Sequence, residues 1–370
     1  MWIFLLALIL VYTAFVSILA SGIIKLYYQN KEKADTESVH TDVIIPFRNE
    51  ANNLHKLLHD LLNQTYPSSH FHILFIDDHS TDGGGKIIND AIKKHNLNAS
   101  LLPLTPDKEG KKAALLTGIE NSNNPYILTT DADCRMSSNW VKCMITQAKN
   151  NQSDLLLGPV IHTGKSVVGR LQSVESLSLL AVTMGTAGLG IPVLSNAANM
   201  VIRRNVLKSL QDPFNTNISS GDDIFLMETL KSNKNHIVFN VDQAALVYTR
   251  ASESWKILIQ QRSRWMSKTR HYRFGSSKLT MIIFGIIQMG FLISIPVLIV
   301  NQALLILLFL WLFKILYDHL LMYLVSTKYN VTFRLTDTIV FSALYPFWTL
   351  ITTLIGYYTK ALWKGRTVKL

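Results

Sequence analysis

The sequence has little cysteine and lacks the phosphate-binding loop of ATPases. Its two cysteines, Cys134 and Cys143, show no repeated spacing of the kind that holds a metal. The pattern Gly-x-x-x-x-Gly-Lys-Ser/Thr is missing, which disfavours a P-loop ATPase. We expect both cysteines to be reduced, buried, small residues of a cytoplasmic domain.

Charge is scarce near the N-terminus, because residues 1–26 carry no charged side chain before Lys25. This run is long enough to span a bilayer, which takes about 20 apolar residues. The run lacks the positively charged n-region of a signal peptide and is longer than the apolar part of one. Since Lys25, Lys31 and Lys33 follow it, the positive-inside rule predicts that the next domain is cytoplasmic.

A second apolar region covers residues 279–358, and we expect about three membrane segments there, at 279–300, 303–325 and 336–358. The middle segment carries Lys314 and Asp318, which would share one helix face and could pair. Alternatively, a tilted segment would place these groups near its cytoplasmic end.

The count of segments conflicts with the charge of the C-terminal tail. One span before the domain and three after it would put the C-terminus outside, whereas the basic tail at 359–370 favours the inside. Either one C-terminal segment is re-entrant or interfacial, which Pro346 would permit, or the positive-inside rule does not hold for this chain.

The region between, about 40–252, alternates two patterns. Short apolar runs predict strands at 42–46, 71–78, 99–104 and 126–130. Apolar stripes of helical period predict helices at 51–64, 82–95 and 110–122. This alternation predicts an α/β domain, with a mostly parallel sheet and helices on both faces.

Two acidic pairs follow predicted strands: Asp77 and Asp78 end one strand, and Asp131 and Asp133 follow another. In open α/β sheets ligands bind beyond the carboxyl ends of the strands, so both pairs should face one crevice. Four carboxylates there would need a cation, and oxygen ligands suit Mg²⁺ or Mn²⁺. Asp77 and Asp78 could instead cap the next helix.

Five short motifs follow one another along the chain: VIIPFRNE (43–50), FIDDHSTDGG (75–84), TTDADC (129–134), SGDDIFL (220–226) and QRSRW (261–265). With these motifs the chain resembles a membrane-bound family 2 glycosyltransferase, whose fold is called GT-A and whose signatures include Asp-x-Asp, Gly-Asp-Asp and Gln-x-x-Arg-Trp.

The resemblance implies roles for the residues near the donor. Asp77 or Asp78 would contact the nucleoside of a nucleotide sugar, and Lys111 or Lys112 would reach its phosphates. Asp131 would contact the donor and, with Asp133, hold a Mg²⁺ or Mn²⁺ ion as the cofactor.

It also implies roles nearer the acceptor. Asp223 would be the catalytic base, with Asp222 beside it, and Arg264 would hold the diphosphate. Gln261 and Trp265 would meet the acceptor. Residues 196–204 resemble the segment that lines the acceptor pocket, which makes Asn196 and Asn199 candidates, although a core strand is an equal alternative.

The membrane side of the chain is basic and aromatic. The net charge is +11, and the basic residues gather beside apolar segments, which suits lipid headgroups better than nucleic acid. Residues 253–275 fit an amphipathic helix at the bilayer surface. Residues 171–200 are apolar but broken by glycine and proline, so we expect a helix followed by a loop near the acceptor.

We therefore expect an inverting, metal-dependent hexosyl- or N-acetylhexosaminyltransferase, multi-pass in the cell membrane, with a cytoplasmic catalytic domain. It would use a UDP- or GDP-sugar and a lipid or lipid-linked acceptor. The alternatives are a processive polysaccharide synthase, a non-catalytic membrane scaffold of the same fold, and a nucleotidyltransferase.

Overall fold

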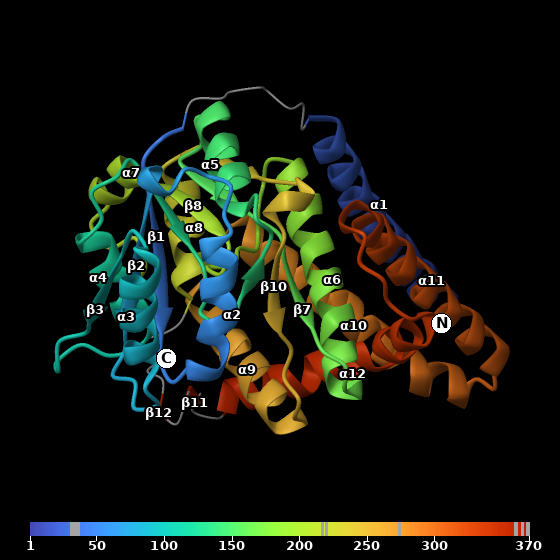
Figure 1. The fold of residues 1–370 in the computed structure, drawn as a ribbon. Coiled ribbons are helices and arrows are strands. Elements are labelled where there is room, and N and C mark those ends of the chain that lie inside the picture. The colour runs from blue at the N-terminus through green and yellow to red at the C-terminus, as the bar shows by residue number, and fades with distance from the viewer. Residues whose placement is uncertain are drawn as a thin grey trace. The chain divides into compact units, whose positions relative to one another are not determined.

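The structure is a computed structural model that describes residues 1–29, 38–215, 218, 221–272 and 275–358, and the backbone of 362–363 and 366–367. Lys31, Lys33 and the side chains of the expected basic tail at 359–370 lie outside the described residues. The chain divides into two compact units (Figure 1). We call them the sheet unit (Asn30–Ile161 and Ser195–Arg250) and the helical unit (Met1–Gln29, His162–Leu194 and Ala251–Leu370).

A seven-stranded sheet forms the centre of the sheet unit, in the order β3-β2-β1-β4-β8-β6-β9. Its parallel half consists of β1 (Thr41–Phe47), β2 (Phe71–Asp77), β3 (Ala99–Pro103) and β4 (Tyr126–Thr129). The other half consists of β8 (Met200–Arg203), β6 (Leu155–Leu157) and β9 (Ile237–Phe239). Strand β8 is antiparallel to its neighbours β4 and β6, and β6 is parallel to β9. All seven residues of β1 are buried, as expected for a central parallel strand. The predicted α/β class with a mostly parallel sheet is confirmed.

The helices of the sheet unit are α2 (Ala51–Leu62), α3 (Gly84–His95), α4 (Lys111–Glu120), α5 (Trp140–Asn150), α7 (Arg204–Lys208) and α8 (Asp222–Ser232), with 3-10 turns at Ser68–His70 and Gln243–Ala245. The leucine stripe of α2 faces the core, and each buried leucine contributes about 1.5–3 kcal/mol. A small sheet pairs β5 (Arg135–Met136), β10 (Val247–Arg250) and β7 (Val160–Thr163).

The two cysteines differ from each other in exposure. Cys134 is buried, as predicted, but Cys143 on α5 is only half-buried, so the expectation that both are core residues is wrong for Cys143. Both thiols are unbridged.

The helical unit contains α1 (Trp2–Gln29), α6 (Val167–Gly188), α9 (Trp255–Ser267), a 3-10 turn at Lys268–His271, α10 (Ser276–Val300), α11 (Leu304–Tyr329) and α12 (Leu335–Tyr358). A short antiparallel pair follows, β11 (Leu362–Trp363) and β12 (Arg366–Thr367). Helix α6 and the loop after it match the helix and loop expected for 171–200.

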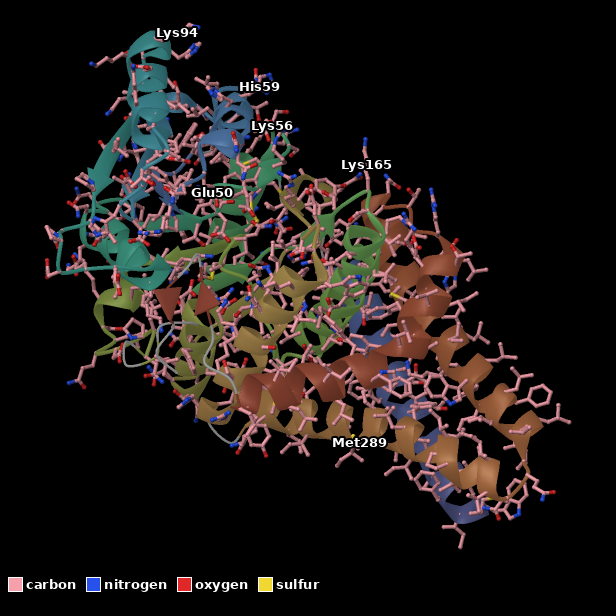
Figure 2. The ribbon with its side chains drawn as sticks, turned by 90° about the horizontal axis from the view of Figure 1, so that it is seen from below. Glu50, Lys56, His59, Lys94, Lys165 and Met289 are labelled. Carbon is pink, nitrogen blue, oxygen red and sulfur yellow. The ribbon has the colours of Figure 1, made fainter. Side chains whose placement is uncertain are left out.

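Four of these helices are long and apolar enough to cross a membrane: α1, α10, α11 and α12. They present apolar side chains outward, as Figure 2 shows for Met289 on α10, which is well exposed. Because a membrane offers these side chains an apolar surrounding, outward exposure carries no penalty there.

The polar groups of α11 turn inward instead. Lys314 Nζ bonds Asp318 Oδ2 at 2.6 Å and the carbonyl of Ser342 on α12 at 3.0 Å. The hydroxyl of Tyr12 on α1 donates to Asp318 Oδ1 at 2.6 Å. The predicted pairing of Lys314 with Asp318 is confirmed. Both residues lie near the middle of α11.

Candidate active site

The Asp-x-Asp motif lies in the turn that follows β4, at the carboxyl end of the parallel strands. Lys111, the first residue of α4, places its Nζ 2.6 Å from Asp131 Oδ1 and 2.8 Å from Oδ2. Asp131 therefore has an ammonium partner before any ligand binds.

The Gly-Asp-Asp motif reaches the same ammonium. Gly221 takes a positive φ of 86°, and Asp222 and Asp223 form the first turn of α8. Burial opposes the charge of Lys111, but Asp131, Asp222 and Asp223 outweigh it and raise the pKa of Lys111 above its ordinary value. The two acidic motifs, about 90 residues apart in the sequence, thus converge on one lysine.

Asp222 leaves an acceptor without a partner. Its side chain is buried, and its Oδ2 has no hydrogen-bond partner among the described residues. A buried acceptor of this kind costs about 1–3 kcal/mol until a donor reaches it. A ligand that carries hydroxyl groups could supply that donor.

Asp133 lies in an acidic environment. Burial, followed by the charges of Asp131 and Glu50, raises the pKa of Asp133 to about 6, although Lys111 and a 3.2 Å hydrogen bond from Thr249 oppose the shift. A carboxylate crowded by other carboxylates is stabilised by a cation. Glu50, at the end of the VIIPFRNE motif, was not assigned a role from the sequence, although its position just after β1 could have suggested one.

The sheet unit offers a cation only part of a coordination shell. No group of three or more His, Cys, Asp or Glu side chains stands ready for a metal within the part of the chain that the structure describes. Mg²⁺ is commonly held by one or two carboxylates together with substrate phosphates. Asp131 and Asp133 fit that requirement.

The acidic pair after β2 divides into two different environments. Asp78 is buried, and the Nη1 of Arg48 donates to its carbonyl at 2.8 Å and lies 3.7 Å from its carboxylate. Asp77 is half-buried, and its Oδ1 accepts the backbone N–H of Ser80 at 2.8 Å. Asp77 is therefore the accessible member of the pair.

Neither Asp77 nor Asp78 caps the next helix, so the capping alternative is wrong. Asp82 has that role: its Oδ1 accepts from the N–H of Gly84 at 3.0 Å, and its Oδ2 accepts from the N–H of Ala51 at 2.7 Å. One side chain thus serves the first turns of both α3 and α2. The sequence signal was an Asp directly before the glycine run.

Lys112 points away from Lys111. It is 7% exposed, and its Nζ donates to the carbonyls of Phe214, Asn215 and Ile218. These bonds fasten the segment that leads to α8. The expectation that Lys112 reaches a phosphate is therefore wrong, and Lys111 remains the candidate.

Asn199 belongs to the core. It is 0% exposed, and its Nδ2 donates to the carbonyls of Pro159 and Ala245 at 2.9 and 2.7 Å. Its Oδ1 accepts from the indole N–H of Trp140 at 3.0 Å. Because the whole amide is engaged inside the unit, the expected acceptor contact of Asn199 is wrong. Asn196 is half-buried in the preceding loop, where its Oδ1 accepts the N–H of Ala198.

The Gln-x-x-Arg-Trp motif lies on α9 of the helical unit. Gln261, Arg264 and Trp265 are half-buried, whereas the intervening Arg262 is buried. Arg262 pairs with Glu175 of α6 at 2.6 Å. The sequence did not reveal that Arg262 pairs with Glu175, because a buried ion pair leaves no periodic signal.

Residues 42–210 match the family model described as Glycosyl transferase family 2. This range includes the motifs that contain Asp77 and Asp131. Over this part of the chain the match agrees with the resemblance to family 2 glycosyltransferases that the motifs indicated.

Several proteins named as glycosyltransferases are similar to this chain. The glycosyltransferase AglE of Haloferax volcanii is 28% identical over 185 residues, 49% of this chain and 58% of AglE. The probable glycosyltransferase YdaM of Bacillus subtilis is 25% identical over 60% of this chain and 53% of YdaM. The poly(ribitol-phosphate) beta-N-acetylglucosaminyltransferase TarP of Staphylococcus aureus is 26% identical over 53% of this chain and 59% of TarP. Each match spans little more than half of the relative's length.

The fold of this chain is similar to that of a solved structure. The mannosyltransferase PcManGT from Pyrobaculum calidifontis, in complex with GDP-Man and Mn²⁺, superposes with a TM-score of 0.56 at 14% identity. The likeness covers 92% of this chain and 99% of that one. It supports the predicted GT-A architecture.

Proposed function

We propose that this protein transfers a sugar, with inversion, from a UDP- or GDP-sugar to a lipid or lipid-linked acceptor at a membrane. The observation that carries the proposal is the convergence of Asp131, Asp222 and Asp223 on Lys111. Such a site combines the ammonium of Lys111, the carboxylates of Asp131 and Asp133 and the candidate base Asp223. It lies at the edge of the sheet where α/β proteins bind ligands.

The donor's diphosphate would lie beside Asp131, Asp133 and Lys111. A Mg²⁺ or Mn²⁺ ion held by Asp133 and Asp131 would neutralise charge that builds on the leaving nucleoside diphosphate. Lys111 would exchange its bond to Asp131 for phosphate oxygens, and Asp77 would receive the nucleoside. Arg264, with its planar guanidinium, suits a second contact to the diphosphate.

Asp223 would remove the proton from the acceptor hydroxyl. It is half-buried in the first turn of α8, where the helix N-terminus and Lys111 favour a negative charge. A direct attack by that hydroxyl on the anomeric carbon inverts the configuration there. The Oδ2 of Asp222, which has no hydrogen-bond partner among the described residues, is a candidate acceptor for a hydroxyl of the substrate.

The helical unit supports the proposed acceptor and location. Four candidate spans hold the protein in a membrane, and the exposed Trp255 and Ile257 of α9 suit the headgroup region. A lipid-borne acceptor would arrive at that surface. The basic residues after α1 favour a cytoplasmic sheet unit in the cell membrane.

The test is release of nucleoside diphosphate by the detergent-purified protein from a panel of UDP- and GDP-sugars, with Mg²⁺ or Mn²⁺ and a membrane lipid extract. Asp223→Asn should reduce turnover by about 10²–10⁴-fold. Asp133→Asn should abolish the dependence on metal. Glu120→Gln, which changes a 61% exposed carboxylate on the far end of α4, should behave as wild type.

The alternatives predict other outcomes. No release from any donor would favour the scaffold, and release of pyrophosphate from a nucleoside triphosphate would favour nucleotidyl transfer. Mass spectrometry of the product decides between one added sugar and the ladder of lengths that a processive synthase makes. Undiminished release by Asp223→Asn would show that this residue is not the base.

A further inference from the structure

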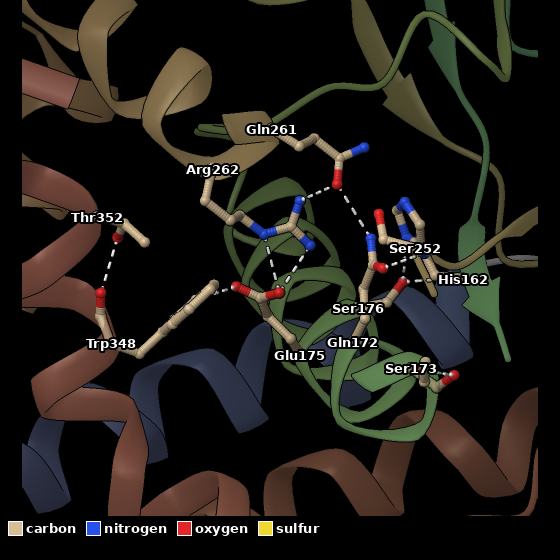
Figure 3. Close-up of polar contacts among 11 residues, drawn as sticks. His162, Gln172, Ser173, Glu175, Ser176, Ser252, Gln261, Arg262, Trp348 and Thr352 are labelled. Carbon is tan, nitrogen blue, oxygen red and sulfur yellow. Dashed lines mark hydrogen bonds and ion pairs between the residues drawn. The ribbon is translucent and has the colours of Figure 1, made fainter. Parts of the chain in front are cut away.

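A buried ion pair joins three helices of the helical unit. Arg262 of α9 and Glu175 of α6 are each 4% exposed. The Nε and Nη2 of Arg262 lie 2.9 and 2.6 Å from Glu175 Oε2 (Figure 3). The other oxygen, Oε1, accepts from the indole N–H of Trp348 on α12 at 3.3 Å. One carboxylate thus connects α6, α9 and α12.

The same arginine touches two residues of the Gln-x-x-Arg-Trp motif. Its Nη1 donates to Gln261 Oε1 at 2.9 Å, and its guanidinium carbon lies 4.0 Å from the centre of the Trp265 ring. Arg262 therefore orients the amide of Gln261 and covers one face of Trp265. Both of these residues are the ones proposed to meet the acceptor.

Gln261 is held from a second side. Gln172 of α6 donates through Nε2 to Gln261 Oε1 at 3.1 Å and accepts the backbone N–H of Ser252 at 2.7 Å. Figure 3 shows the Nε2 of Gln261 on the side away from Gln172, outside the contacts drawn. The network fixes the oxygen of Gln261 and leaves its nitrogen as the donor that a ligand could use.

Burial of two charges is an expensive way to join helices, because well-packed apolar residues of similar volume are often equally or more stabilising. A guanidinium differs from an apolar side chain in that its planar fork fixes direction. Arg262 donates through all three guanidinium nitrogens, and the flat face of its guanidinium covers the Trp265 ring. The arrangement is therefore better suited to orienting neighbouring side chains than to holding the helices together.

We propose that Glu175 and Arg262 are positioning residues for the acceptor: Glu175 fixes the guanidinium of Arg262, which sets the orientation of Gln261 and Trp265. This inference rests on the proposed function, since it names residues that act on the same acceptor site. Neither Glu175 nor Arg262 needs to touch the substrate.

The test compares acceptor KM, donor KM and kcat for Glu175→Gln and Arg262→Lys in the full-length protein. Arg262→Lys keeps the charge but loses the fork. In both variants acceptor KM should rise about tenfold, the scale of a lost oriented contact, while donor KM stays within about twofold. The matched control is Asp337→Asn, which breaks the 3.0 Å pair of Arg170 with Asp337 between α6 and α12, two of the three helices that Glu175 connects. It should leave acceptor KM unchanged.

A double variant separates orientation from stability. Glu175→Leu with Arg262→Met replaces the pair by apolar side chains of similar size and should melt near the wild-type temperature. We expect its acceptor KM to remain raised. If the double variant recovers both its melting temperature and its acceptor KM, the pair serves stability alone and the inference is overturned.

The outcome also distinguishes this inference from the proposed function. If wild type transfers sugar and every variant keeps its acceptor KM, the positioning role fails and the function stands. If wild type transfers no sugar, the proposed function fails, and hydrogen–deuterium exchange over Trp255–Ser267 tests whether the Glu175–Arg262 pair orders α9. Faster exchange there in Glu175→Gln than in Asp337→Asn supports the positioning role of the pair, and equal exchange overturns it.

Discussion

At the scale of single residues, Lys111 and Lys112 are adjacent on α4, yet their side chains contact different groups. Consecutive residues of an α-helix point about 100° apart, since one turn takes 3.6 residues. Lys111 faces the carboxylates after β4 and at the start of α8. Lys112 faces the protein interior and bonds three carbonyls.

We predict opposite effects for the two lysines. Lys111→Gln should lower release of nucleoside diphosphate while changing the melting temperature little, because its half-exposed partner Asp131 can be solvated. Lys112→Met should lower stability, by about 1–3 kcal/mol for each carbonyl that loses its donor without gaining water. Thermal melting and donor turnover, measured on both variants, check this. The reverse pattern would contradict the assigned roles.

His162 makes the stability of the protein depend on pH. Burial, and secondarily the charge of Arg262, lowers the pKa of His162 to about 3 from its ordinary value near 6.5. Between these values the unfolded chain binds a proton that the folded chain does not, so stability falls as pH drops below 6.5. The slope attributable to one such group is at most about 1.4 kcal/mol per pH unit.

The prediction is that His162→Asn flattens this slope. Asparagine can keep a hydrogen bond to Ser176 Oγ, which lies 3.2 Å from the imidazole Nδ1. Melting temperatures of wild type and variant should therefore converge as the pH is lowered from 7 to 5. A constant gap between the two curves would show that His162 does not titrate on unfolding.

At the scale of elements, glycines allow α1 and α6 to approach closely. A Cβ added to Gly22 would lie 1.9 Å from the carbonyl oxygen of Gly185, and one added to Gly188 would lie 1.9 Å from that of Gly22. Real Cβ atoms never come so near, so larger residues would force the helices apart. Small residues have this use wherever membrane helices pack by contact rather than by the hydrophobic effect.

We predict that Gly22→Ala and Gly188→Ala each lower the melting temperature in detergent, by the few degrees that about 1–3 kcal/mol of overpacking produces. Gly285→Ala is the matched control on α10, since its Cβ would meet nothing within 4 Å. The control should be neutral or slightly stabilising, because alanine favours a helix more than glycine does. Equal effects at all three glycines would argue against a close seam.

The helices and strands show what the sequence could and could not reveal. Apolar periodicity located β1, α2 and the spans, and strand ends located Asp77, Asp131 and Asp133, because these signals are local. The burial of Asn199 and Lys112 depends on partners 40 to 106 residues away, such as Pro159 and Ile218. No pattern of single residues encodes such long-range contacts, and the Glu175–Arg262 pair was missed for the same reason.

At the scale of the whole molecule, contacts within the helical unit bear on how many of the four candidate helices cross the membrane. Three residues join α10 to α11, so α11 ends on the side of the membrane where α10 begins. Five residues, which reach at most about 20 Å, join α11 to α12 and cannot cross a core of about 30 Å. At its other end α12 meets Arg270, whose Nη2 donates to the carbonyl of Gly356 at 3.3 Å, just before α10 begins.

If Arg270 lies on the side of the membrane where α10 begins, both ends of α12 lie on that side, and we predict that this helix enters the membrane without crossing it. Its path runs along α9: the ring of Trp348 lies 6.0 Å from that of Trp255, and a Cβ on Gly356 would lie 2.6 Å from the carbonyl of Ser263. Pro346 inside α12 would permit a bend. A re-entrant or interfacial α12 would remove the conflict with the positive-inside rule.

We predict that the C-terminus lies on the same side as α9. A cysteine added after Leu370, in a background with Cys134→Ala and Cys143→Ser, should react with a membrane-impermeant thiol reagent under the same conditions as Lys256→Cys on α9. Gln302→Cys, in the turn between α10 and α11, should react under the opposite conditions. In intact cells only the Gln302→Cys protein should be labelled if the sheet unit is cytoplasmic, and permeabilisation should expose the other two. If the added cysteine instead follows Gln302→Cys, α12 crosses the membrane, and the contacts between α12 and α9 must form at a depth where Arg270 would be costly to place.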